Sequence, residues 1–178
     1  MKLQTILRHI VGYCVGFSIF AAGIPSGLYL VSIKMDRYLP VNVIPTEKIR
    51  MCVALLIGTI GIVFALWSNL YLLLVGKGGP ADGFGIAISP RTQYLVTSGP
   101  YRYTRHPMMF GALMVYFALS LLFNSLVCLG IVAVFLACAA VYLKLVEEKR
   151  LLEDFGDAYK QYRSTVSMLL PLPSRKRP

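Results

Sequence analysis

Long uncharged stretches are the feature that most constrains how this chain can fold. Residues 10–33 and 51–75 contain no Asp, Glu, Lys or Arg, and each stretch is 24 or 25 residues long. A helix of that length extends about 36 Å, enough to cross a bilayer with some tilt. A third uncharged stretch, residues 108–143, is interrupted by Asn124 and Ser125, which predicts a C-terminal helical hairpin. The sequence therefore predicts an all-α integral membrane protein with four transmembrane helices.

Composition and charge support this prediction and give it an orientation. Only 15% of the residues are charged, against about 25% in soluble domains. Of the 18 Lys and Arg residues, 14 fall before residue 10, in the 76–107 loop or after residue 143. The positive-inside rule then places both termini in the cytoplasm. We interpret the net charge of +10 as an orientation signal, because the chain has no nucleic-acid-binding motif. No protein partner is indicated.

The chain divides at residue 75 into two parts. Residues 1–75 are expected to form an N-terminal transmembrane helical pair that acts as a scaffold. Residues 76–178 are expected to form the catalytic region: a cytoplasmic cofactor loop rich in Gly and Pro, the hairpin and an interfacial helix. The four cysteines lie in apolar stretches without paired spacing, so we predict no metal site. Apolar side chains at helical spacing predict the amphipathic C-terminal helix, at Leu151, Leu152, Phe155, Tyr159 and Tyr162.

The segment SGPYRYTRHPMMFG carries the main functional signal. Pro107 suits the first position of a helix, which places Arg105 and His106 at its mouth beside free backbone N–H groups that favour anions. The outgoing arm of the hairpin is about 25 Å long and the returning arm about 33 Å. The returning helix should therefore bring Glu147 and Glu148 back to the level of His106.

Such a group of charges could hold a small zwitterionic or cationic molecule, and S-adenosyl-L-methionine fits this description. Its carboxylate suits the helix mouth and basic groups such as Arg105, whereas its ammonium and sulfonium suit Glu147, Glu148 and aromatic faces. The apolar hairpin beside this site would admit a lipidic acceptor.

The order GPYRYTRHPM, hairpin, EE, FGDAYKQYRSTVSMLLPLP resembles the integral-membrane methyltransferases, which include the isoprenylcysteine carboxyl and phospholipid N-methyltransferases. The resemblance covers Gln93 to Pro173. It implies a methyltransferase that uses S-adenosyl-L-methionine at the cytoplasmic membrane face, on a lipidic or small hydrophobic acceptor. Carried over by position, the family's cofactor pocket corresponds here to Gln93, Tyr94, Leu95, Val96, Tyr101, His106, Pro107, Met108, Met109 and Glu147.

The chain departs from the family at two of these places. Met109 stands where the family often has a tyrosine, so a hydroxyl is missing there. The isoprenylcysteine enzymes have an acceptor-binding arginine one turn before the paired glutamates; Leu143 occupies this position, and Lys144 is the nearest cation. We therefore take Lys144 as the candidate substrate-binding residue. Methyl transfer to a carboxylate or thiolate needs no general base, and for an amine Glu148 or His106 could accept the proton, so no catalytic residue is assigned.

Other interpretations stay open. Arg105 and His106 could contact lipid headgroups, and the two glutamates could pair with Lys144, Lys149 and Arg150 on a solvated helix end. As alternatives to a methyltransferase, the chain could be a membrane reductase that uses a nicotinamide cofactor on a sterol-like lipid, or a non-enzymatic four-helix membrane protein.

Overall fold

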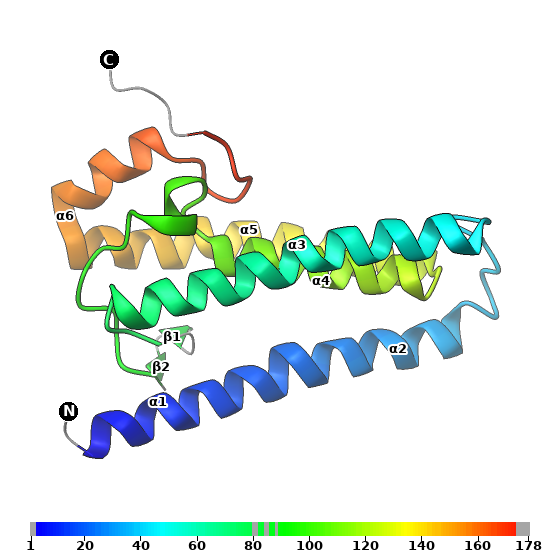
Figure 1. Ribbon diagram of the computed structural model, residues 1–178, viewed down its shortest axis with the longest axis horizontal. Helices are drawn as coiled ribbons and strands as arrows, with labels where there is room; N and C mark the ends of the chain where they lie inside the picture. Colours follow the sequence, from blue (N-terminus) through cyan, green and yellow to red (C-terminus); the bar gives the residue numbers. More distant parts are fainter. Residues whose placement is uncertain (1–2, 80–81, 84–85, 88, 174–178) are drawn as a thin grey trace.

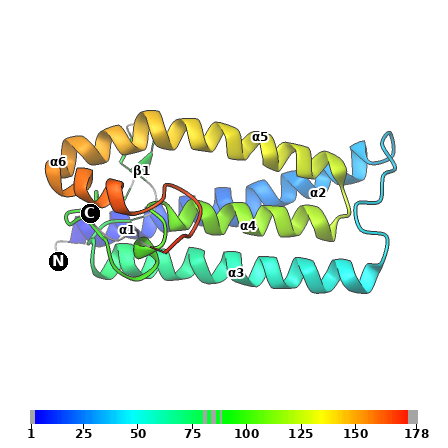
Figure 2. The same ribbon diagram turned by 90° about the horizontal axis from the view of Figure 1, so that it is seen from above.

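The protein is a bundle of long helices that lie side by side along one axis. The computed structural model describes residues 3–79, 82–83, 86–87, 89–173. Figures 1 and 2 show the start of α1, the two short strands and α6 at one end of the bundle, with two connecting loops at the other. The elements are α1 (Leu3–Gly16), the π-helix η1 (Phe17–Gly23), α2 (Ile24–Met35), α3 (Glu47–Leu74), β1 (Asp82–Gly83), β2 (Ile86–Ala87), the 3-10 helix η2 (Gly99–Arg102), α4 (Pro107–Leu122), α5 (Leu126–Tyr142), the π-helix η3 (Leu143–Glu147) and α6 (Glu148–Thr165).

The described residues include three helices that are long and apolar enough to cross a membrane. These are Ile6–Met35, Glu47–Leu74 and the apolar part of Leu126–Thr165. Between 6% and 22% of each span is buried inside the protein, so most of its apolar surface faces outward, as expected for contact with lipid. The helical class and the membrane location are thus confirmed. α4, with 16 residues, is a shorter apolar helix of about 24 Å.

The first span is one helix with a π-helical segment placed just before Pro25. The N–H of Ile24 bonds to the carbonyl of Ile19, five residues back. The carbonyl of Phe20 would next need the N–H of Pro25, which proline lacks. It accepts instead from the Tyr116 hydroxyl at 2.8 Å. A carbonyl orphaned by proline thereby joins the first span to α4.

α3 and α4 approach most closely where glycine faces glycine. A Cβ atom at Gly61 would lie 2.7 Å from the Gly111 carbonyl oxygen, and one at Gly111 would lie 2.6 Å from the Gly61 carbonyl oxygen. No larger side chain fits at this crossing, which agrees with the use of small residues where membrane helices touch. In contrast, a Cβ at Gly16 would meet no described atom within 4 Å, so the glycines of the first span do not all mark contacts.

The predicted hairpin is present, and a polar network closes its turn. Asn124 adopts a positive φ of 54°, and Ser125 caps α5 by accepting from the Cys128 N–H at 3.1 Å. Ser125 also donates to Asp36 at 2.7 Å, while the Asn124 side chain accepts from the Ile44 N–H at 3.0 Å. The loop between the first two spans is therefore tied to the hairpin turn. We call these bonded groups the far-end network.

The amphipathic helix α6 contains a sharp bend. Gly156 has φ 54° and ψ −128°, a conformation that side chains disfavour, and the helix changes direction there. Figure 1 shows α6 leaving the line of α5 and returning over the end of the bundle. Tyr159 and Tyr162 are buried beyond the bend. They form a small core with Val166, against which Leu95 packs.

Candidate functional site

The segment from Tyr103 to His106 is held against the chain that follows α6. The backbone N–H of Arg105 donates to the carbonyl of Ser167 at 2.9 Å, and that of His106 donates to the carbonyl of Met168 at 3.2 Å. The C-terminal segment therefore already accepts from the N–H groups of both residues. These bonds leave the prediction of an anion at the first turn of α4 untested.

The side chains of this segment meet a glutamate from the far side of the hairpin. The Arg105 Nη1 atom lies 2.7 Å from Glu148 Oε1, and His106 Nε2 lies 3.9 Å from the same oxygen. Arg163 approaches the other carboxylate oxygen, with Nε at 3.5 Å from Oε2. The Glu148 side chain is 3% exposed. We call Arg105, His106, Glu148, Arg163 and Tyr159 the charge cluster.

Two irregularities in the helix after the hairpin assemble this cluster. The π-helix η3 ends with the Glu148 N–H bonded to the Leu143 carbonyl, five residues back, and so turns Glu148 relative to a regular α-helical register. The bend at Gly156 then brings Arg163 back to Glu148 across 15 positions. π-helical insertions are frequent at functional sites, since they re-aim the side chains that follow.

The charge cluster contains buried polar atoms that lack a well-aligned hydrogen bond within the described residues. They are Arg105 Nε and Nη1, His106 Nε2, Glu148 Oε1 and Tyr159 OH. The contact between Arg105 and Glu148 is close enough for an ion pair but is not aligned as a hydrogen bond. Buried polar atoms are rarely left this way without a reason. The cluster offers both cationic hydrogen-bond donors and a carboxylate acceptor. A small zwitterion needs both kinds of group to bind its two charges.

Glu147 contacts different residues from those that Glu148 contacts. Its carboxylate forms an ion pair with Arg150 at 3.1 Å, with side chains 21% and 25% exposed. Burial raises the pKa of the Tyr101 phenol, and the negative charge of Glu147 and the nearby Tyr13 raise it further. Tyr101 is therefore protonated at neutral pH, so its phenol can donate a hydrogen bond but cannot serve as a base. Of the two glutamates, Glu148 meets Arg105 and His106.

The loop residues predicted to line the cofactor pocket fall into two groups. Gln93 and Tyr94 are exposed, and Lys77 Nζ lies 5.3 Å from the centre of the Tyr94 ring. Leu95 packs against the tyrosines of α6, and Val96 is buried. The structure thus brings Leu95 toward the charge cluster, buries Val96 and leaves the first pair at the surface.

The predicted residues at the start of α4 and the end of α5 also differ in environment. Pro107 is fully buried at the first turn of α4, and Met108 is half-buried. Met109 packs against the apolar core between α2, α4 and α5, so it contributes to packing there. Lys144 is exposed, whereas its neighbour Leu143 is buried.

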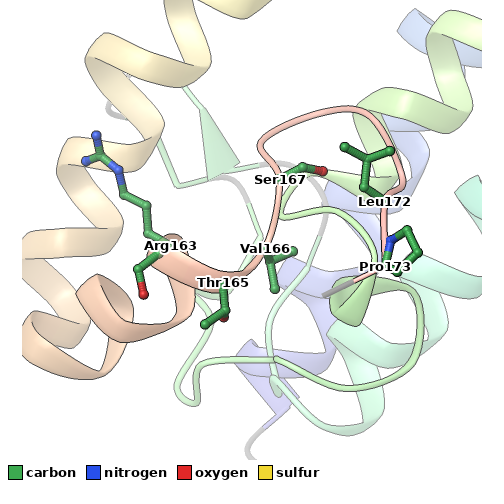
Figure 3. Close-up of a pocket in the computed structure, with 7 residues that line it drawn as sticks. Arg163, Thr165, Val166, Ser167, Leu172 and Pro173 are labelled. Atoms are coloured by element: carbon green, nitrogen blue, oxygen red, sulfur yellow. The ribbon is translucent and has the colours of Figure 1, made fainter. Parts of the chain in front are cut away.

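Two cavities lie beside the charge cluster. One, of about 320 Å³, lies between α6 and the loop before η2, with Leu95, Arg102 and Tyr162 in its wall. The other, of about 200 Å³, is lined by residues 163–167, Leu172 and Pro173 (Figure 3). In Figure 3 the guanidinium of Arg163 points away from Ser167. Arg163 lines the second cavity with a half-exposed side chain, whereas neither cavity contains Arg105, His106 or Glu148.

Sequence analysis did not single out Thr104, Tyr159 or Arg163 for the site. Thr104 is fully buried next to Arg105, and Tyr159 is fully buried beside the guanidinium of Arg105. A usable signal was Gly156, because a glycine in the middle of an amphipathic helix allows a bend that returns Arg163 to Glu148. Among the described residues, no group of three or more His, Cys, Asp and Glu side chains is arranged to hold a metal ion.

Comparison with known proteins gives the chain its family. Residues 49–158, more than half of the chain, match the profile of the phospholipid methyltransferase family. The chain belongs to this family. The matched region runs from α3 into α6 and contains Arg105, His106 and Glu148, so the charge cluster lies mostly within the part that family members share. The resemblance to the integral-membrane methyltransferases is confirmed.

Two curated relatives are both named as methyltransferases that act on methanethiol. Over 75 residues the chain is 37% identical to a methanethiol S-methyltransferase of Mycobacterium tuberculosis, covering 42% of this chain and 30% of the relative. Over 74 residues it is 31% identical to methanethiol S-methyltransferase 1 of Bradyrhizobium diazoefficiens, covering 40% of this chain and 24% of the relative. The match thus spans less than a third of either relative. No solved structure matches the chain.

Proposed function

We propose that this chain transfers a methyl group from S-adenosyl-L-methionine to a lipidic or small hydrophobic acceptor at the cytoplasmic face of the membrane. The observation that carries the proposal is the charge cluster. Arg105, His106 and Glu148 meet in a buried place, and several of their polar atoms lack a well-aligned hydrogen bond among the described residues. In a family of membrane methyltransferases, a methyl donor with both charges is the ligand that best fits these groups.

The charges of these residues fit this donor. Arg105 and His106 would bind its carboxylate, since a guanidinium forms strong charge-assisted hydrogen bonds and an imidazole N–H can donate another. Glu148 and Glu147 would bind its ammonium from two sides of the helix end. Arg163 would then take a carboxylate oxygen of Glu148 or of the ligand.

The chemistry asked of the protein is modest. The donor supplies an electrophilic methyl group on a sulfonium, and the acceptor displaces the thioether directly. The protein holds the two in line and keeps water out, and such orientation can supply several kcal/mol of the barrier reduction, on the order of 7–11 kcal/mol in the best model systems. The buried cluster under α6 and the apolar hairpin meet both needs. With a thiolate or carboxylate acceptor no residue of this chain has to remove a proton.

A small thiol is the first acceptor to try. The two curated relatives are named for methanethiol, and a thiolate is a strong nucleophile at modest cost in proton loss. The phospholipid amine and the isoprenylcysteine carboxylate are the other acceptor types that suit an apolar cleft. We place Lys144 on the acceptor side, because it is exposed at the end of the hairpin next to the two glutamates.

The proposed topology has four spans. α4 would cross with α5 as a hairpin, although it is shorter than the other spans, and its first turn would begin at the membrane surface. Both termini, the 76–106 loop and α6 would then face the cytoplasm, in line with the distribution of Lys and Arg. In this arrangement residues 1–75 support the fold and residues 76–178 contain the site.

A transfer assay with methyl-labelled donor tests the proposal. Purified protein in detergent is given labelled S-adenosyl-L-methionine with methanethiol, phosphatidylethanolamine or a farnesylated cysteine. Label should appear in one acceptor class, and the rate should fall at least 100-fold in His106→Ala. A folded protein that labels none of the three and does not bind the donor would contradict the proposal. Reduction of a sterol by a nicotinamide cofactor would replace it with the reductase alternative.

A further inference from the structure

We infer that the chain after α6, residues 166–172, is a strap that positions Arg105 and His106, and that it does so through the buried hydroxyl of Thr104. This inference rests on the proposed function, because the two positioned residues are those assigned to the cofactor. Thr104 itself is a positioning residue and contacts neither proposed reactant.

The strap is bonded along its length to the segment before α4. The hydroxyl of Thr104 donates to the carbonyls of Met168 and Leu169, at 2.9 and 3.0 Å. The Leu172 N–H donates to the Tyr103 carbonyl at 3.0 Å, and Thr104 and Ser167 form a parallel bridge. Together with the N–H groups of Arg105 and His106, this gives bonds from the strap to every residue between 103 and 106.

Apolar anchors hold the strap at two points, so it is more than a loose tail. Val166 is buried in the small core of Tyr159 and Tyr162. Leu169 packs against the core cluster that Tyr116 forms with residues of α2 and α5. Because the two anchors lie in different cores, the carbonyls of Ser167 and Met168 between them are fixed relative to both α4 and α6.

Thr104 is the residue through which the strap can control the site. It is fully buried, and its oxygen also accepts weakly from the His106 N–H at 3.4 Å. The Thr104 hydroxyl therefore links the strap carbonyls of Met168 and Leu169 to the His106 N–H, so that it is bonded to the backbone on the far side of Arg105. A buried hydroxyl in this place must remain bonded, since an unpaired one is costly. Loss of this hydroxyl would remove its bonds to the Met168 and Leu169 carbonyls, so the backbone of Arg105 and His106 would be held by fewer bonds to the strap and would move more easily.

The test compares Thr104→Val, which keeps the shape and removes the hydroxyl, with Thr104→Ser, which keeps it. Thr165→Val is the matched control, because the Thr165 hydroxyl donates to carbonyls of its own helix, at 3.0 Å to Tyr162 and 3.5 Å to Gln161. Hydrogen exchange of the Arg105 and His106 amides reports on the strap without any ligand. Calorimetry with S-adenosyl-L-methionine and steady-state transfer report on the site.

We expect Thr104→Val to speed exchange of the two amides at least tenfold and to raise the donor Kd and KM at least tenfold, with a smaller change in kcat. Thr104→Ser should restore both, and Thr165→Val should leave both unchanged. Faster exchange with unchanged Kd and KM would overturn the inference, since the strap would then be merely structural. Unchanged exchange would overturn it as well. If the wild type shows slow amide exchange but binds no donor, the proposed function fails. This result differs from the two outcomes that would overturn the inference about the strap.

Discussion

The two ends of the hairpin treat their buried polar groups in opposite ways. At the far end, Ser125 donates to Asp36 and accepts from the Cys128 N–H, and Asn124 accepts from the Ile44 N–H, at 2.7–3.1 Å. These bonds close the turn of the hairpin. At the other end, the side chains of Arg105, His106 and Glu148 are more deeply buried than Asn124 and Asp36, yet they keep atoms without well-aligned hydrogen bonds among the described residues. Both ends join segments that are distant in the sequence.

This difference separates structure from function within one fold. A satisfied network needs nothing further, so its contribution is stability. A buried cluster whose ion pairs are poorly aligned for hydrogen bonding is less stable than a satisfied network, and a ligand can supply the missing bonds. The far-end network therefore fixes the shape of the hairpin, and the charge cluster is the part of the molecule suited to binding.

Among the substitutions that test this comparison, removal of Glu148 should change stability and donor binding most. Glu148→Ala leaves Arg105 and His106 buried without their counter-charge, which typically lowers the free energy of unfolding by about 3–5 kcal/mol. Thermal and denaturant unfolding in detergent measure this loss, and calorimetry should show that donor binding is gone. A variant as stable as the wild type would mean that solvent reaches the cluster.

Glu147→Gln should separate the two glutamates. We expect donor binding to weaken by roughly 1.5–3 kcal/mol, the worth of a charge-assisted hydrogen bond. Stability should change little, because the ion pair with Arg150 is partly exposed and such pairs contribute about 0–1 kcal/mol. Titration calorimetry checks the donor affinity of the folded variant, and scanning calorimetry checks its stability. Glu153→Gln, on an exposed position of α6, is the control. Unchanged affinity would remove Glu147 from the pocket.

Ser125→Ala tests the opposite end and should have the smallest effect. Loss of the cap on α5 should lower the free energy of unfolding by about 0.5–2 kcal/mol. Donor affinity should stay within twofold of the wild type, because the far-end network is separated from the charge cluster by the length of the hairpin. A large loss of affinity with little loss of stability would contradict the division between the two ends.

Much of the fold could be predicted because membrane helices follow simple rules. Uncharged stretches gave the spans, Asn124 and Ser125 gave the turn, and helix rise placed the paired glutamates level with His106. The division into two parts and the four-span topology stay predictions. The short α4 shows why, since length and composition alone do not decide whether it crosses.

The details of the site were harder to predict, because they depend on departures from regular helix. Without the π-helix η3 one cannot tell which of Glu147 and Glu148 faces Arg105. The bend at Gly156 reverses the helix within α6, and the strap bonds to Thr104 join segments more than 60 residues apart. The bonds of the Arg105 and His106 N–H groups to Ser167 and Met168 are likewise contacts between distant segments. The roles of the predicted pocket residues stay proposals.

Calorimetric binding of S-adenosyl-L-methionine and its demethylated product to the detergent-purified protein tests the central claim most directly. The account predicts micromolar binding of both ligands by the wild type, and loss of binding in His106→Ala and Glu148→Gln while both variants remain folded. Absence of binding by well-folded wild-type protein would contradict it.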